Sequence, residues 1–270
     1  MVAPAAPRAL VDPALERDRP ALDRLRAASL PLLGGIIVWE LIARLWQVSF
    51  LPPFSDVVRA AARMTASGEI IGPLTTSLAN LAIGYGLAVL FGVSLGLLMG
   101  RYRAVEHLFD LYVYGFLVAP KIVFIPVLLA LFGFSRSVQV AVIFLSACFV
   151  IVVNAMTAIR TVDPRCIEMA RSFGASERQL FWRVLLPGAL PLTMAGARLG
   201  MGRAIKGMII GELFITIVGM GALLRGYGSR FDSASVFGIL LIVVAVALVC
   251  SALVRAIELR LTHWAGGRAR

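Results

Sequence analysis

The chain has 270 residues, of which 60% are hydrophobic and 15% charged, and its mean hydropathy is +0.90. Soluble domains average about 45–50% apolar and about 25% charged residues, so this composition argues against a water-soluble fold and indicates a membrane protein. In such a chain the formal charge of +11 predicts arginines gathered on one membrane face rather than a nucleic-acid-binding surface.

The pattern of apolar segments predicts an all-α, polytopic membrane protein. Residues 1–28 are rich in Ala, Pro and Arg, which predicts a disordered tail. They are not predicted to be a signal peptide, because they contain no apolar segment followed by a cleavage site. Residues 29–262 form the membrane domain and 263–270 a second tail. About 20 apolar residues cross a hydrocarbon core of about 30 Å, and continuous apolar runs exclude barrel strands. We expect six helices, at 30–50, 75–100, 111–135, 137–159, 191–217 and 233–254.

The distribution of basic residues predicts the orientation of these spans. Sixteen of the 26 Lys and Arg residues fall in segments on the side of the N-terminus, and five fall in the opposite loops. Because cytoplasmic loops carry the excess of positive charge, both termini are predicted to be cytoplasmic.

A short helix is predicted on the outer membrane surface after the first span. Pro52 and Pro53 indicate a turn, and Ser55 or Asp56 can cap the helix that follows. Its predicted apolar face consists of Val57, Val58, Ala61 and Met64.

Small residues recur every four positions in two predicted spans. This spacing lets helix backbones approach closely in lipid, and chance in a chain with 25 Gly is the alternative. The second span contains Ala88, Gly92, Gly96 and Gly100, and the fifth contains Gly207 and Gly211. The pattern predicts helix packing and says nothing about a substrate.

The predicted cytoplasmic loop 161–191 has the strongest local pattern. Asp163 followed by Pro164 predicts a capped helix start, and Gly174 is placed for a left-handed helix end. The apolar stripe between them is Ile167, Ala170 and Phe173.

A second short helix follows Gly174. Ser176 and Gln179 match a capping box, and Pro187 and Pro191 mark the helix end and the entry to the next span. Its apolar face consists of Leu180, Phe181, Val184 and Leu185. A connector needs only a few residues, so an ordered loop of about thirty predicts a docking surface.

These residues also carry a resemblance to a known family. Residues 168–175, then Leu186-Pro187 and Pro191, resemble the EAA loop (E-A-A-x-x-x-G-A, then L-P-x-x-x-P) of membrane subunits of binding-protein-dependent ABC importers, with Met169 in place of the usual Ala. The resemblance covers about residues 36–262 and is to the nitrate/sulfonate/taurine-type permease branch. It also rests on Trp39-Glu40-Leu41, Leu51-Pro52, Pro120, Pro126, Val162-Asp163-Pro164 and Gly211-Glu212-Leu213.

The resemblance implies a type I ABC importer permease in the bacterial inner membrane, whose loop couples a separate ATPase to transport. The implied coupling residues are Glu168, Met169, Ala170, Phe173, Gly174, Ala175, Phe181 and Pro187. The implied partners are a second copy of the chain, two ATP-binding subunits that hold ATP and Mg, and an extracytoplasmic solute-binding protein. The implied cargo is a small organic anion such as an alkanesulfonate; a pyrimidine-like precursor or an aromatic acid stays open.

Charged residues inside the predicted spans are costly in lipid and mark pairing or function. Glu40 and Arg44, at i and i+4, favour a local ion pair. Lys121 either faces an aqueous path that attracts an anion, pairs with Glu212, or lies near the membrane interface.

Arg203 and Lys206 share one face of the fifth predicted span. Glu212 lies nearly opposite Arg203, because nine residues separate them and each adds about 100°. Arg198 and Arg203 can also extend to the membrane edge. We expect Lys121, Lys206 and Glu212 to line the translocation path.

The alternative function is a secondary transporter or channel that works without an ATPase; a multi-pass scaffold is a third possibility. Neither explains an ordered cytoplasmic loop. The chain lacks the G-x-x-x-x-G-K-[ST] loop, so we expect a non-catalytic subunit without an ATP site. Isolated cysteines and histidines predict neither disulfides nor a metal site: Cys148, Cys166, Cys250, His107 and His263.

Overall fold

The computed structural model describes residues 21–46, 50–215 and 218–264, with side chains from Leu30 onward, and this part of the chain contains helices and no strands. The predicted all-α fold class is confirmed. The helices are α1 (Ala21–Trp46), α2 (Phe54–Ala66), α3 (Ile71–Arg101), α4 (Arg103–Val118), α5 (Ile125–Phe132), α6 (Arg136–Arg160), α7 (Pro164–Ser172), α8 (Glu177–Leu180), α9 (Leu186–Ile215), α10 (Met220–Ser229) and α11 (Ser233–Leu261).

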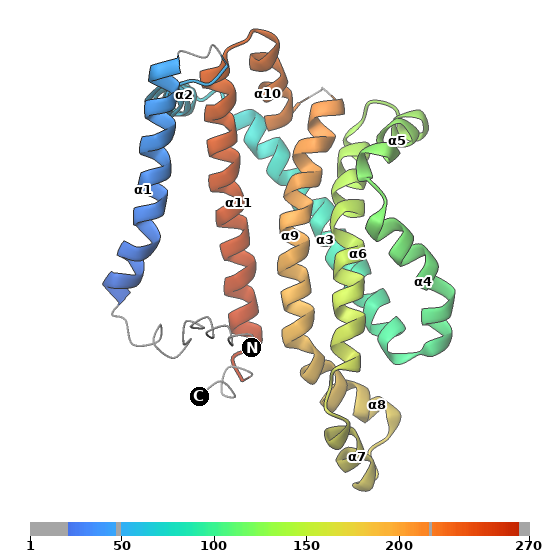
Figure 1. Cartoon of the computed structure of the whole chain (residues 1–270). Coiled ribbons are helices and arrows are strands. Elements are labelled where there is room, and N and C mark those ends of the chain that lie inside the picture. Colours follow the sequence, from blue (N-terminus) through green and yellow to red (C-terminus); the bar gives the residue numbers. More distant parts are fainter. Residues whose placement is uncertain (1–20, 47–49, 216–217, 265–270) are drawn as a thin grey trace, which may run out of the picture.

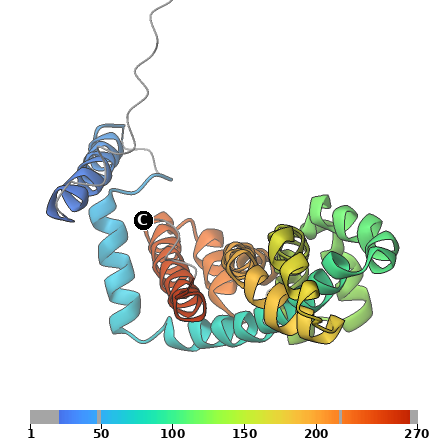
Figure 2. The same cartoon turned by 90° about the horizontal axis from the view of Figure 1, so that it is seen from below.

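Helix α6 is the centre of the helix packing. It lies beside α9, and α3 crosses both helices obliquely (Figures 1 and 2). Helices α4 and α5 lie on the side of α6 away from α11, and α11 packs against α2, α9 and α10. Helix α1 stands at the opposite edge and contacts the other helices mainly through α2.

Four helical segments are long and apolar enough to cross a membrane: α3, α6, α11 and the continuous stretch Glu177–Ile215. A fifth span arises if α4 and the following helical residues Lys121–Phe132 are counted together, but these two parts are bent by 102°. The prediction of one helix over 111–135 is therefore wrong. Pro120 has no N–H to continue the α4 hydrogen bonds, and Ala119 before it is extended.

The first predicted span corresponds to α1, and its crossing of the membrane stays a prediction. The helix begins at Ala21, within the predicted tail, and residues 47–49 near its end lie outside the described part. The tail predictions for 1–20 and 265–270 fall on residues that the structure does not describe.

The predicted helix after the first span is α2, but its N-terminus is not capped as expected. Ser55 and Asp56 lie inside the helix and give it no side-chain cap. Instead Glu40 of α1 accepts hydrogen bonds from the Ser55 N–H (3.0 Å) and the Ser55 hydroxyl (2.9 Å). The predicted Glu40–Arg44 ion pair is confirmed at 2.7 Å. The carboxylate of Glu40 therefore joins α1 to α2.

The apolar face of α2 differs from the prediction at one position. Val57, Ala61 and Met64 are buried as expected, together with Ala60, whereas Val58 is 42% exposed. The buried face packs on α11, where a Cβ at Gly238 would lie 3.1 Å from the Met64 methyl group.

The predicted small-residue packing of the second span is confirmed as the α3–α6 contact. A Cβ added to Gly92 would lie 3.0 Å from the Cys148 carbonyl oxygen, and one on Gly100 would lie 2.7 Å from the Met156 carbonyl oxygen. No larger side chain fits without separating the helices. The contact extends to Gly84, which was not singled out from the sequence.

A second glycine face lies on α9 and packs against an adjacent side of α6. Cβ atoms there would lie 2.7 Å from Ile151 Cγ1 at Gly200 and 3.2 Å from the Val142 carbonyl oxygen at Gly207. Helix α6 is thus held between glycine-lined faces of two neighbours, and Ile143, Ile151 and Val152 are fully buried in it.

The glycine contact generates a stability prediction. Gly96→Ala places a Cβ 2.7 Å from that of Ala155, so we expect a loss of about 1–3 kcal/mol and a lower Tm of the purified permease in detergent. Gly86→Ala is the matched control, because Gly86 lies on the same helix with nothing within 4 Å of the added atom. An equal Tm for the two variants would contradict the close contact between α3 and α6 at Gly96.

Candidate functional site

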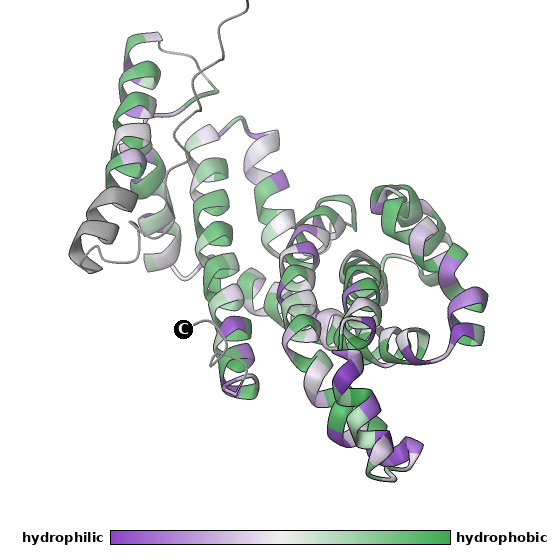
Figure 3. Cartoon of the chain, turned by 60° about the horizontal axis from the view of Figure 1, so that its bottom comes forward, coloured by the Kyte–Doolittle hydropathy of each residue, from purple (hydrophilic) through white to green (hydrophobic). Residues whose placement is uncertain are grey.

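Helices α7 and α8 project beyond the other helices at one end of the molecule (Figure 1). Hydrophilic residues gather on this projection, whereas the neighbouring long helices are mainly hydrophobic (Figure 3). We call residues 161–191 the coupling loop. Its position indicates that it leaves the membrane and is available to another protein.

The caps of the coupling loop form as predicted. Asp163 accepts a hydrogen bond from the Arg165 N–H at 2.9 Å, and Ser176 and Gln179 make both bonds of the capping box. Gly174 has a φ of +76°, and the N–H of Ala175 donates to the Ala170 carbonyl at 3.1 Å. This is a Schellman ending, which fixes the angle between α7 and α8.

The prediction that the second loop helix ends at Pro187 is wrong. The chain continues from α8 through a π-helical segment, Phe181–Leu185, directly into α9. Pro187 cannot donate to the carbonyl four residues earlier, and the wider turn, closed by the Leu186 N–H on the Phe181 carbonyl, accommodates this loss. Glu177–Ile215 is consequently one continuous helical body that links the loop to the membrane.

An apolar cluster attaches the coupling loop to the ends of α6 and α9. Ile167 and Ala170 of α7 pack on it, as do all four residues of the predicted apolar face of the second helix. Its buried members are Ala158, Ile159, Val162, Leu180, Leu185 and Ala189. Movement of the loop must therefore move these helix ends.

Three large apolar side chains of the coupling loop remain exposed. Phe173 of the predicted apolar stripe is 85% exposed, because the helix ends there and the cap turns the side chain outward. Met169 and Trp182 are each 59% exposed. Trp182 was missed because its exposure depends on the direction of the π-helical turn. Exposed apolar side chains at a polar end indicate a protein interface.

Glu177 connects the coupling loop to α3. It pairs with Arg171 of α7 at 3.2 Å and with Arg101 at the end of α3. Glu177 and Arg171 are largely exposed to solvent and Arg101 is partly exposed, so the pairs contribute little stability and mainly orient the loop.

Lys121 does not pair with Glu212. Its Nζ donates hydrogen bonds to the carbonyls of Phe116, Leu117 (3.3 Å) and Ala119 (2.8 Å) at the end of α4. A cation at this place compensates the unpaired carbonyls of the helix C-terminus.

The remaining predicted charges lie on two faces of α9. Arg203 and Lys206 share an exposed face, and Glu212 is only 1% exposed on the other face, as the helical spacing predicts. Arg198 pairs with Glu258 of α11 at 3.3 Å.

Glu212 joins three helices at the end opposite the coupling loop. Its carboxylate accepts hydrogen bonds from the Ser77 hydroxyl of α3 at 2.6 Å and from the Gly221 N–H at 2.9 Å. The Met220 N–H in turn donates to the Ser77 oxygen at 3.0 Å. Gly219 has a φ of +126°, and a Cβ there would lie 2.7 Å from both Glu212 oxygens. Glu212 thus caps the N-terminus of α10.

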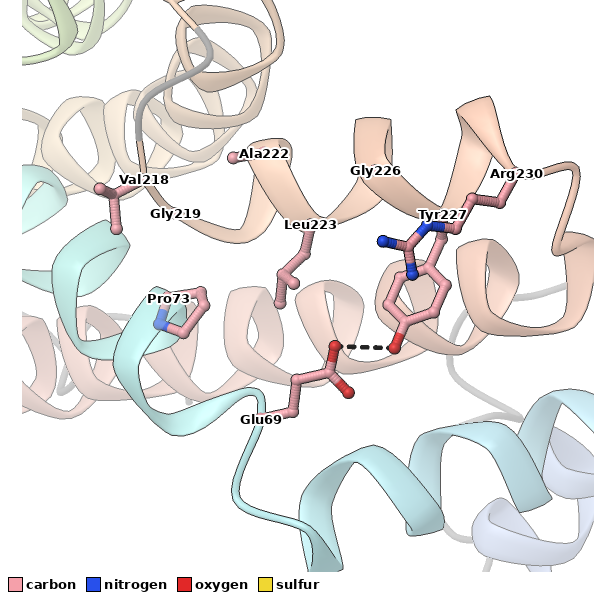
Figure 4. Close-up of a pocket in the computed structure, with 9 residues that line it drawn as sticks. All are labelled: Glu69, Pro73, Val218, Gly219, Ala222, Leu223, Gly226, Tyr227 and Arg230. Atoms are coloured by element: carbon pink, nitrogen blue, oxygen red, sulfur yellow. Dashed lines mark hydrogen bonds between the residues drawn. The ribbon is translucent and has the colours of Figure 1, made fainter.

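A small pocket lies beside this junction, between α10 and the start of α3 (Figure 4). Its volume is about 290 Å³. The Tyr227 hydroxyl donates to Glu69 across it at 2.7 Å, and this bond raises the pKa of the Tyr227 hydroxyl. The bond fixes α10 to the turn that precedes α3.

The chain matches a known family over most of its length. Residues 88–263 fit the model of the binding-protein-dependent transport system inner membrane component. The chain belongs to this family.

Two curated relatives and one solved structure illustrate the match. The chain is 27% identical to the taurine transport system permease of Escherichia coli, over 91% of this chain and 92% of that protein. It is 35% identical to an aliphatic sulfonates transport permease of the same organism, over 74% and 77%. The inward facing methionine ABC transporter shares the fold, with a TM-score of 0.58, 19% identity and coverage of 70% and 94%.

The chain is therefore a permease subunit of an ABC importer, multi-pass in the inner membrane and non-catalytic, and it works with an ATPase and a binding protein. Within the described residues, no group of three His, Cys, Asp or Glu side chains is arranged to hold a metal ion.

The Glu212 junction generates a second prediction. Glu212→Ala leaves the Ser77 hydroxyl and the Gly221 N–H without their acceptor in a buried site, which costs about 1–3 kcal/mol. We expect a lower Tm of the purified permease and faster proteolysis at α10. Glu69→Ala is the control: it removes an exposed hydrogen bond to the same helix and should change Tm much less. Similar shifts for both variants would show that burial does not decide the effect.

Proposed function

We propose that this permease imports a small organic oxyanion of the sulfonate class, as a homodimer with two ATPase subunits inside the cell and a solute-binding protein outside. Both termini then lie in the cytoplasm. The observation that carries the proposal is the coupling loop, a capped helix–Gly–helix that continues as one helical body into α9 and exposes Phe173.

The coupling loop is suited to transmit force from an ATPase. Shifting a two-state gate from 1:99 to 99:1 takes about 5.5 kcal/mol, which a flexible contact cannot transmit. Fixed caps at Asp163, Gly174 and Ser176 make the loop stiff, and its exposed apolar side chains offer the contact. The proposed coupling residues are Glu168, Met169, Ala170, Phe173, Gly174, Ala175, Phe181 and Pro187, joined by Trp182.

The exposed cations of α9 support both the dimer and the anionic cargo. Arg203 and Lys206 are exposed on one face of α9. Cations facing lipid at this depth are costly, so a second copy that encloses a water-filled path with this face is favoured. The proposed path includes Lys206. It also includes Lys121, which lies at the break that follows α4. Glu212 is not included, because its oxygens are occupied inside the fold.

The sulfonate class is supported by the relatives named for taurine and aliphatic sulfonates together with these cations. A sulfonate presents three oxygens that ammonium and guanidinium groups bind by charge-assisted hydrogen bonds. The relatives support the class of cargo and not an individual compound.

The stiffness of the bend is tested at Gly174. We expect Gly174→Val to abolish coupled uptake, because a β-branched residue resists a φ of +76°. Gly174→Asn is the matched control, since Asn adopts this conformation far more readily. The measurements are uptake and substrate-stimulated ATPase activity of the reconstituted importer. Full coupling in the Val variant would contradict the role of the bend.

The path and the cargo are tested by Lys206→Gln in proteoliposomes with the partner ATPase and binding protein. We expect uptake of a radiolabelled alkanesulfonate to fall about tenfold, the effect of losing about 1.4 kcal/mol, while complex assembly is unchanged. Arg59→Gln is the control, because Arg59 is an exposed residue of α2 that pairs with Asp56 of the same helix at 2.7 Å. If the binding protein binds no sulfonate, the proposed cargo is wrong. If the Lys206→Gln variant transports normally, the proposed path is wrong.

A further inference from the structure

An apolar groove runs along the contact between α3 and α6. Its volume is about 760 Å³, and its walls include Ile83, Leu87, Leu90, Val140 and Phe144. On α3 it extends from Ile83 to Ser94, about 16 Å at 1.5 Å per residue. This length equals about half of a hydrocarbon core of about 30 Å, the depth of one lipid leaflet.

One end of the groove carries a fixed cation. Arg136, the first residue of α6, lines the groove together with Ser137. Its Nε donates to Asn80 Oδ1 at 2.5 Å, and Asn80 donates from its amide nitrogen to Gln139 Oε1. Asn80 and Gln139 are 1% and 6% exposed. A buried amide pair therefore holds the guanidinium at the groove mouth.

Arg136 lacks an acidic partner among the residues that the structure describes: no ion pair there includes it. Its Nε donates to Asn80, and its terminal NH₂ groups make no hydrogen bond to the residues that the structure describes. A guanidinium held this way presents a fork that matches two oxygens of a phosphate.

We propose that this groove binds an anionic phospholipid, with one acyl chain along α3 and α6 and the phosphate on Arg136. An apolar groove one leaflet deep, with a single cation at its mouth, matches the shape and charge of such a lipid. An extended protein segment in the same groove would need partners for its backbone N–H and C=O groups, which apolar walls do not supply. Arg136 lies at the α6 end opposite the coupling loop, so the proposed orientation places the lipid in the outer leaflet.

The lipid site adjoins the junction at Glu212 through α3. Asn80, which orients Arg136, follows Ser77 by one helical turn, and Ser77 bonds to Glu212. A bound lipid thus stabilises the α3 segment that positions α10. This inference requires only the fold and stands if the sulfonate proposal fails.

The test is native mass spectrometry of the permease–ATPase complex released from nanodiscs that contain either phosphatidylglycerol or phosphatidylcholine. We expect the wild type to retain phosphatidylglycerol, and Arg136→Gln to retain about tenfold less. Arg59→Gln is the matched control, another Arg at the same end but outside the groove, and should retain the wild-type amount.

A second variant separates lipid binding from misfolding. Ala141→Phe fills the groove and leaves Arg136 in place, so it should also lose the lipid while keeping the Tm measured without phosphatidylglycerol. Equal retention of the two lipids by the wild type would overturn the proposal. Wild-type retention by Arg136→Gln and Ala141→Phe would likewise overturn it and assign the groove to another occupant.

Discussion

The close backbone contact of α6 with α3 and α9 is the constraint on which the rest of the structure depends. Within a membrane, lipid tails are as apolar as Leu, so helices gain little from hydrophobic burial and associate through tight packing. Gly92 and Gly100 of α3 supply this packing on one side of α6, and Gly200 and Gly207 of α9 on an adjacent side. This arrangement fixes where the coupling loop leaves the membrane, because α6 ends and α9 begins at the apolar cluster beneath it.

Helix α9 connects the two polar ends of the molecule. At one end it continues into α8 and the coupling loop, and at the other Glu212 binds α3 and α10. The hydrogen bonds of Glu212 are buried and costly to break, whereas no hydrogen bond joins α9 to α6 along their glycine contact among the residues that the structure describes. Displacement of α9 by an ATPase is therefore best accommodated by sliding along α6, a shear of packed helices.

The sequence predicts well those features whose interactions close within a few residues. The Asp163 cap, the positive φ of Gly174 and the Ser176–Gln179 box depend only on neighbouring atoms, and all three are found. The Glu40 bond to Ser55 and the Glu212 bond to Ser77 were missed, because their partners lie 15 and 135 residues away. The expected helix end at Pro187 failed for a third reason: a π-helical turn offers an alternative to ending the helix.

The distribution of buried polar groups along α3 shows how one helix can be fixed and still permit movement. Near its start, Ser77 bonds to Glu212 and Asn80 bonds to Gln139 and Arg136, so this part is joined to α9, α10 and α6. Nearer the coupling loop, the contact consists of Gly92 to Gly100 and apolar side chains of α6. Hydrogen bonds of fixed geometry hold the first part, because leaving buried partners unsatisfied is costly. The second part can shift along α6 without losing such buried bonds, and the Arg101–Glu177 pair joins its end to the loop that an ATPase would move.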